Sequence, residues 1–210
     1  VPDGTPVHFV HGEHAVGASE VVKHLVATGR SQFLLVAGPK ASTAANIRLQ
    51  SWLAEIDVSE TKAVDCYRGD WQAQSGYLAI SEAIGKQLSF DAVVVASDQM
   101  ALGVLRALDE FSIKVPDQVA VVGFDGITDS AYFNPPLTTV KQDFTAIGEQ
   151  CVIQAVELKN HPSNTPTQFK QTRIPVELIV RKSSQPKIKQ AYDKKGIQEL
   201  LKQIELRLPE

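Results

Sequence analysis

Two apolar runs, at residues 92–96 and 119–124, each end in a short polar segment that carries an aspartate. Apolar runs of this length, separated by a helical pattern over 98–111, are typical of buried parallel strands. In an open parallel sheet, ligands bind just beyond the carboxyl ends of the strands. Asp98 and Asp125 follow these two runs, so the pattern predicts a small-molecule site at this edge of the sheet.

Strand-like and helix-like segments alternate along most of the chain. Strands are predicted at 6–10, 33–37, 63–67, 92–96, 119–124 and 138–141. Helices are predicted at 20–28, from Ser42 or Thr43 through Ile56, and at 72–87, 98–111 and 145–158. A final extended pair is expected at 169–174 and 177–180. The alternation predicts an α/β fold with a doubly wound, mostly parallel sheet.

The pattern changes after residue 182, where Ser-Ser-Gln-Pro opens a polar linker predicted over 183–194. Residues 1–182 would then form the core of the protein. Within 195–208, apolar residues recur at the 4-3-4 spacing of a coiled-coil seam, namely Ile197, Leu201, Ile204 and Leu208. An amphipathic helix that docks back on its own domain would show the same spacing, so the seam alone leaves both interpretations open.

Composition narrows the classes of function. The 210 residues carry 21 basic and 24 acidic side chains, and the net charge of -3 argues against nucleic-acid binding by this segment through a basic face. No apolar stretch approaches membrane-spanning length, and the first residues do not form a signal peptide. Cys66 and Cys151 are predicted to be buried thiols rather than a disulfide, which suits a reducing cytoplasm.

Signatures of catalysis are missing from the sequence. It holds no nucleophile elbow, phosphate-binding loop, dinucleotide fingerprint or metal-spaced set of His and Cys, so we expect neither an enzyme nor a cofactor. An acid/base pair of Asp98 and Asp125 is the enzymatic alternative, but no nucleophile accompanies it. His8, His11 and His14 would face together on a helix; their segment is predicted as strand and loop, with solvated side chains and no metal.

Several segments together resemble the LacI/GalR family of bacterial transcription repressors. The segments are 24–29, 35–39, 48–52, 69–77, 97–103, 122–125 and 135–144, within an unbroken match over about 5–182. The resemblance implies a type I periplasmic-binding-protein fold, with a carboxyl-terminal subdomain and part of an amino-terminal one. The family's DNA-binding headpiece and the first half of the amino-terminal subdomain are expected to precede this chain, which would make it a fragment.

The resemblance also implies a sugar site between the subdomains. A sugar needs fixed charged acceptors, a donor fork and an aromatic platform. Six residues match the family's binding positions: Arg48, Trp71, Ser97, Asp125, Gln142 and Phe144. Ser97 stands where the nearest family pattern has asparagine, a longer side chain with an amide donor, which leaves the identity of the sugar open.

Each of these residues also has a plainer interpretation. Arg48 could pair with a surface carboxylate, Trp71 could pack in the core, and Asp125 could form a turn with Gly126. Gln142 and Phe144 could serve only as packing at a hinge. Asp98 is predicted to cap the helix that follows it rather than to touch ligand. Their joint match to one site favours the binding interpretation for Arg48 and Trp71.

The function implied is that of a cytoplasmic, sugar-responsive regulator whose effector acts on operator DNA through the missing headpiece. Segments 6–10, 138–142 and 169–174 are expected to be hinges between the subdomains. A two-fold dimer is expected through Leu102, Leu105 and Phe133, and the helix at 195–208 is expected to join two dimers into a tetramer. The alternative, a periplasmic sugar-binding protein for transport, would need a signal peptide.

Overall fold

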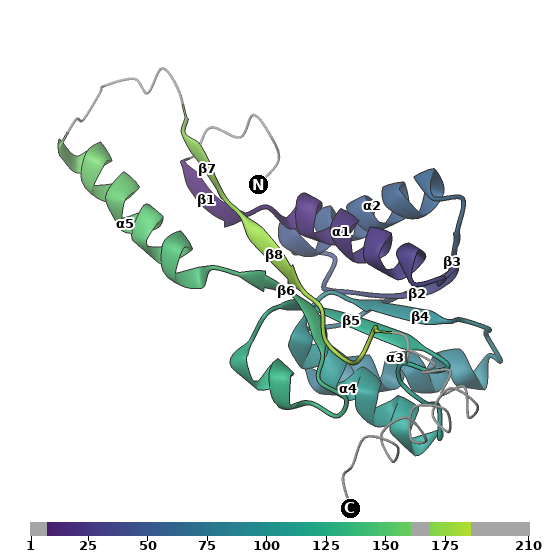
Figure 1. Ribbon diagram of the computed structural model, residues 1–210. Coiled ribbons are helices and arrows are strands. Elements are labelled where there is room, and N and C mark those ends of the chain that lie inside the picture. The colour runs from purple at the N-terminus through teal and green to yellow at the C-terminus, as the bar shows by residue number, and fades with distance from the viewer. Residues whose placement is uncertain (1–7, 161–168, 186–210) are drawn as a thin grey trace, which may run out of the picture.

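The computed structural model describes residues 8–160 and 169–185 and shows an α/β architecture (Figure 1). A six-stranded sheet has the order β3-β2-β4-β5-β6-β8. Its members are β2 (Gln32–Ala37), β3 (Lys62–Arg68), β4 (Ala92–Val95), β5 (Ala120–Asp125), β6 (Thr138–Gln142) and β8 (Val176–Ile179). All neighbours are parallel except β6 and β8, which run antiparallel. The predicted doubly wound, mostly parallel sheet is confirmed.

Helices cover both faces of this sheet (Figure 1). On one face lie α1 (His14–Ala27) and α2 (Thr43–Val58), and on the other lie α3 (Ala73–Gly85) and α4 (Asp98–Glu110). Strands β2 and β4 lie between these two layers and are buried on both faces, which explains their uninterrupted apolar sequence. No helix in the described part of the chain is long and apolar enough to cross a membrane.

A smaller part projects from the main sheet. It consists of a parallel pair, β1 (Phe9–Gly12) and β7 (Gln171–Ile174), beside α5 (Phe144–Asn160) (Figure 1). The predicted final extended pair is therefore wrong as a pair, because β7 joins β1 and β8 joins β6. Within the described residues, the chain crosses between the two parts at Glu13, Asp143 and Pro175. Asp143 and Pro175 directly follow the hinge segments predicted at 138–142 and 169–174, whereas Glu13 lies three residues after the segment predicted at 6–10.

The N-terminal cap was predicted correctly for α2 and wrongly for α4. Ser42 caps α2 by accepting a hydrogen bond from the Ala45 N–H, as the sequence predicts. The predicted cap of α4 by Asp98 is wrong, because the Ser97 hydroxyl accepts the bond from the Met100 N–H. Asp98 is instead fully buried and turned away from its own helix.

Three further predictions need correction. Helix α1 begins at His14, six residues before the predicted start, so His14 lies in a helix and is buried rather than solvated. Cys66 and Cys151 are free thiols as predicted, but both are exposed. Leu105, predicted at a dimer interface, is only 5% exposed and belongs to the core of its own chain, whereas Leu102 is 40% exposed.

The packed core extends past the boundary drawn from sequence. Ser183 and Ser184, predicted to open the linker, are fully buried between the sheet and α1. The Ser183 hydroxyl donates to the Val121 carbonyl at 2.6 Å and accepts from the Thr138 N–H at 2.8 Å. Ser184 lies 2.7 Å from both Thr138 Oγ1 and His24 Nε2. The predicted helix at 195–208 and most of the linker lie outside the described residues.

Asp98 holds three elements together through its carboxylate. It accepts hydrogen bonds from the Thr139 hydroxyl at 2.5 Å and from the Ile127 N–H at 2.9 Å, and thereby links α4, β6 and the loop after β5. Burial raises the pKa of Asp98 from its ordinary value of 3.8 to about 6, and the charge of Asp125 acts in the same direction. The hydrogen bonds lower the pKa but do not outweigh burial.

Replacing Ser183 by alanine should destabilise the fold by about 1–3 kcal/mol, because the Thr138 N–H and the Val121 carbonyl lose a buried partner. Ser89→Ala, at an exposed serine, is the matched control and should stay within about 0.5 kcal/mol of the parent. Urea unfolding followed by circular dichroism measures both. Equal stability of the two variants would mean that residue 183 lies outside the cooperative core.

Replacing Asp98 by asparagine should remove a pH-dependent loss of folding stability. The folded pKa of about 6 lies above the ordinary 3.8, so the parent loses stability relative to Asp98→Asn as pH rises through this interval. The change should be about 2 kcal/mol between pH 4 and 7. Other titrating groups are common to both proteins and cancel in the difference. Urea unfolding at several pH values measures it, and a pH-independent difference would contradict the assignment.

Candidate functional site

A cavity of about 560 Å³ lies at the carboxyl edge of the main sheet, where the smaller part of the fold approaches it. Its walls come from β1, α1, α2, the segments after β3, β4 and β5, the end of β6 and the start of α5. All six residues predicted from the sequence line it, namely Arg48, Trp71, Ser97, Asp125, Gln142 and Phe144. The fold thus brings together side chains that are 96 positions apart in the chain.

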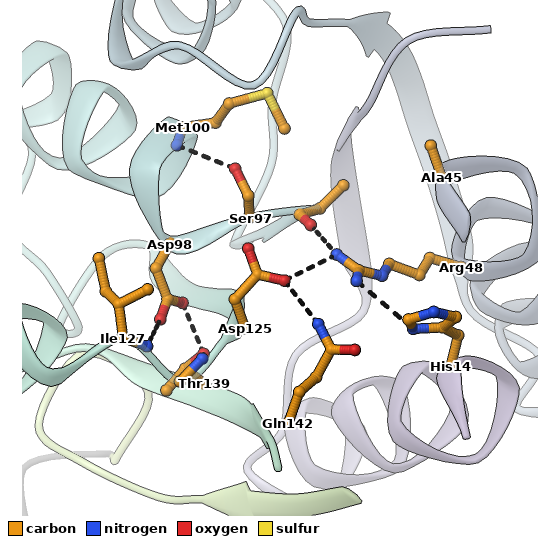
Figure 2. A network of polar contacts seen from close by, with 12 residues as sticks. His14, Ala45, Arg48, Ser97, Asp98, Met100, Asp125, Ile127, Thr139 and Gln142 are labelled. Atoms are coloured by element: carbon orange, nitrogen blue, oxygen red, sulfur yellow. Dashed lines mark hydrogen bonds and ion pairs between the residues drawn. The ribbon is translucent and has the colours of Figure 1, made fainter. Parts of the chain in front are cut away.

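Asp125 is the polar centre of the cavity (Figure 2). It ends β5 with a φ of 114°, a conformation that non-glycine residues rarely adopt and that is often found at functional sites. Its Oδ1 accepts a hydrogen bond from Gln142 Nε2 at 2.8 Å and lies 3.3 Å from Arg48 Nη1. Burial raises its pKa, while Arg48 and Gln142 act in the opposite direction.

Arg48 is buried on every side. It is 4% exposed, and its guanidinium lies 3.7 Å from the centre of the Phe124 ring. Nη1 donates to the Ala96 carbonyl and pairs with Asp125, and Nη2 lies 3.4 Å from His14 Nδ1 (Figure 2). Burial lowers the pKa of Arg48, and the two nearby aspartates oppose this effect. The surface-pair interpretation of Arg48 is therefore wrong, since it pairs inside the site.

Trp71 forms one wall of the cavity. It is half-buried, has a φ of 76° and lies with its ring centre 5.9 Å from the Arg48 guanidinium. A Cβ atom at Gly38 would collide with the Trp71 ring, so the absence of a side chain at Gly38 is what lets the indole lie there. The fully buried tryptophan of this chain is Trp52, in the core.

The other three predicted residues differ in how deeply they are buried and in what they contact. Ser97 is nearly buried and uses its oxygen to cap α4, which leaves its hydroxyl proton available toward the cavity. Gln142 ends β6, is 7% exposed and holds Asp125. Phe144 begins α5 and is 57% exposed, so it contributes an apolar edge from the smaller part of the fold.

His14 is a site residue that the sequence reasoning missed. It lines the cavity from the first turn of α1 and packs 5.9 Å from the Phe124 ring. Burial, with the adjacent charges of Arg48 and His11, lowers its pKa to about 4, so the ring is neutral at neutral pH. The described residues contain no cluster of three metal-ligating side chains, and His8, His11 and His14 do not converge on one point.

A protein-family profile for the periplasmic binding protein-like domain matches residues 22–184. The lactose operon repressor of Escherichia coli (strain K12) is 35% identical over 184 residues, which cover 88% of this chain and 50% of that protein. The lactose operon repressor of Klebsiella pneumoniae is 39% identical over 180 residues, covering 84% of this chain and 49% of that protein. The chain thus spans about half the length of these relatives.

Solved structures give the same result. A dimeric Lac repressor with an 11-residue C-terminal deletion superposes with a TM-score of 0.83 at 34% identity, covering 89% of this chain and 67% of that chain. The transcriptional regulator CelR in complex with cellobiose superposes with a TM-score of 0.80 at 29% identity, covering 87% of this chain and 56% of that chain. The chain therefore belongs to the periplasmic binding protein-like family and, within it, carries the core of a LacI-family repressor.

Proposed function

We propose that this chain is the effector-binding core of a sugar-responsive transcriptional regulator. The observation that carries the proposal is the single cavity that collects all six predicted residues around the Arg48–Asp125 pair. Relatives of this chain include repressors of lactose and ribose operons, and a structural neighbour holds cellobiose. In the whole protein, operator DNA would be bound by a headpiece outside this chain.

The hydrogen-bonding groups that the site leaves unused are suited to sugar hydroxyls. Both polar contacts of the Asp125 carboxylate go to Oδ1, which leaves Oδ2 as an acceptor toward the cavity. Ser97 offers a hydroxyl proton, and Trp71 offers an indole face against which the apolar face of a pyranose can pack. A cavity of about 560 Å³ lies within the range of small-molecule sites. Asp125 is thus the anchor and Trp71 the wall.

The proposed control mechanism follows from where the ligand would sit. Phe144 and Ile147 of α5 line the cavity opposite Asp125 and Arg48 of the main body. These two parts are joined only by the crossings at Glu13, Asp143 and Pro175 in the described chain. A sugar that touches both parts favours one relative arrangement of them, and this differential affinity is what can alter a distant DNA-binding unit.

Two other classes fit less well. A periplasmic sugar-binding protein of a transport system shares the fold, but the relatives reported above are repressors. An enzyme would need a nucleophile, a cofactor loop or a metal centre, and the sequence offers no motif for any of them. A regulator of this kind would act in the cytoplasm, where its operator lies.

Asp125→Asn should lower sugar affinity by at least about thirtyfold, because the carboxylate proposed to accept from sugar hydroxyls loses its charge, and truncating one charged partner of a buried hydrogen bond costs about 2–5 kcal/mol. Asparagine keeps the volume and one oxygen that can accept from Arg48, so the fold should be destabilised but should still form. Asp57→Asn, at an exposed position on α2, is the matched control and should bind like the parent. Calorimetric titration of a panel of mono- and disaccharides measures affinity, and circular dichroism checks folding.

Trp71 supplies an independent optical signal for the same experiment. Bound sugar should change its emission, whereas Trp52 is fully buried in the core and should not respond. Parent-like affinity in folded Asp125→Asn would refute Asp125 as the anchor. Failure of every sugar to bind the parent protein would refute the proposed function itself.

Assembly is proposed to be dimeric, through the face of α4 that carries Leu102. Leu102→Asp should give monomers in sedimentation velocity, because a charge would be buried at a two-fold contact. Leu53→Asp, at a similarly exposed leucine on α2, is the control and should leave the dimer intact. Dimers in both variants would exclude this face. A tetramer through the helix at 195–208 remains a proposal from the sequence.

A further inference from the structure

The backbone at Trp71 has a conformation that bulky residues rarely adopt. Its φ of 76° lies in the left-handed region, where a side chain larger than a hydrogen atom is disfavoured. Trp71 lies between the end of β3 at Arg68 and the start of α3 at Ala73, so neither a strand nor a helix imposes this conformation on it. Such a residue keeps its conformation only where the surrounding structure fixes it.

Two side chains connect the residues on either side of Trp71. The Asp70 Oδ1 atom accepts a hydrogen bond from the Gln72 N–H at 2.9 Å, which closes a turn around Trp71. The Ser75 hydroxyl accepts from the Asp70 N–H at 3.2 Å and donates to the Gln72 carbonyl at 2.8 Å. The residues before and after Trp71 are therefore bonded to each other and to one hydroxyl, which restricts rotation of the backbone at Trp71.

The loop after β2 fixes the indole ring from a second direction. A Cβ atom at Gly38 would collide with the ring, so the ring occupies the space next to this glycine. The Gly38 carbonyl accepts a hydrogen bond from Arg68 Nη1 at 3.1 Å, and the same nitrogen donates to Asn46 Oδ1 at 2.9 Å. Since Asn46 belongs to α2, the loop against which the indole packs is itself held between β3 and α2.

The residues that support Trp71 do not line the cavity themselves. Its walls include Trp71 but not Gly38, Asp70 or Ser75. A change at any of these three positions therefore reaches a bound ligand through the indole. A site that is complete for only a fraction of the time binds with its affinity reduced by that fraction. The fixed position of Trp71 is thus itself a contribution to affinity.

We infer that Asp70 and Ser75 are positioning residues, which hold the Trp71 indole in the cavity wall before any ligand arrives, while Gly38 leaves room for the ring. The effect on sugar affinity rests on the proposed function, in which Trp71 is the wall against which the sugar packs. A sugar then meets a wall that is already in place, and none of its binding free energy is spent on ordering the loop.

Three variants remove this support without altering the cavity lining. Asp70→Ala removes the acceptor of the Gln72 N–H, and Ser75→Ala removes the hydroxyl that joins Asp70 to Gln72. Gly38→Ala places a methyl group where the ring lies. Gly38 has no positive φ, so alanine fits its backbone and the indole is the group that has to move.

Two further variants are the controls. Asp70→Asn keeps an oxygen that can accept from the Gln72 N–H, so it should restore the behaviour of the parent. Ser81→Ala removes another hydroxyl of α3, one that donates to the Tyr77 carbonyl at 3.0 Å. It should match the parent as well, because its hydrogen bond lies further along the helix from Trp71.

Acrylamide quenching of tryptophan emission measures the indole directly, without ligand. Trp52 is fully buried and should stay unquenched, so the quenching reports Trp71 and the remaining Trp52 emission shows that the core is intact. Calorimetric titration with lactose, cellobiose, ribose, galactose and glucose measures affinity. Each of the three variants should raise the quenching constant at least about twofold and lower the affinity for the best-bound sugar at least about fivefold, as expected when the indole is in place for about a fifth of the time.

Each outcome decides the inference. Parent-like quenching in folded Asp70→Ala and Ser75→Ala overturns it, because the indole then keeps its place without them. Raised quenching with unchanged sugar affinity overturns it too. If no sugar binds the parent, the proposed function fails, while the quenching comparison still decides whether Asp70 and Ser75 hold the indole. Raised quenching and lowered affinity in the three variants, with Asp70→Asn and Ser81→Ala unchanged, establish the positioning role.

Discussion

The buried Arg48 guanidinium is the constraint on which the site depends. A charge that is 4% exposed needs partners for its donors, and here the Ala96 carbonyl and Asp125 face Nη1 and His14 faces Nη2, while Nε has no hydrogen-bond partner among the described residues. These partners come from the ends of β4 and β5 and from α1, while Arg48 itself comes from α2. One side chain therefore fixes the relative positions of four elements around the cavity, and losing one partner would cost about 3–5 kcal/mol.

The two aspartates at the carboxyl edge of the sheet have different roles because their surroundings differ. Asp98 follows β4 but turns into the protein, where it receives only neutral donors and burial raises its pKa to about 6. Asp125 follows β5 and faces Arg48, so its charge is compensated while one oxygen stays open to the cavity. A structural contact between elements and the proposed ligand anchor thus come from the same residue type after adjacent strands.

The sequence predicts the parts of this structure that depend on local pattern. Apolar runs identify the central strands, and the family resemblance identifies six lining residues of one cavity. The start of α1 escapes prediction because Glu13 makes no side-chain cap, so no local signal marks the helix at His14. Burial of Ser183 is equally hidden, since its partners Val121 and Thr138 are distant in sequence and serine is usually exposed.

His14 lies where the main body and the smaller part of the fold meet. Its ring touches Arg48 on one side and approaches His11 on the other, so it joins the polar centre of the main body to a strand of the smaller part. Because His14 follows the crossing at Glu13 directly, any rotation about that crossing changes the distance between its ring and β1. A ligand in the cavity that both histidines line would resist this rotation, and this is how binding at the proposed site would favour one arrangement of the two parts.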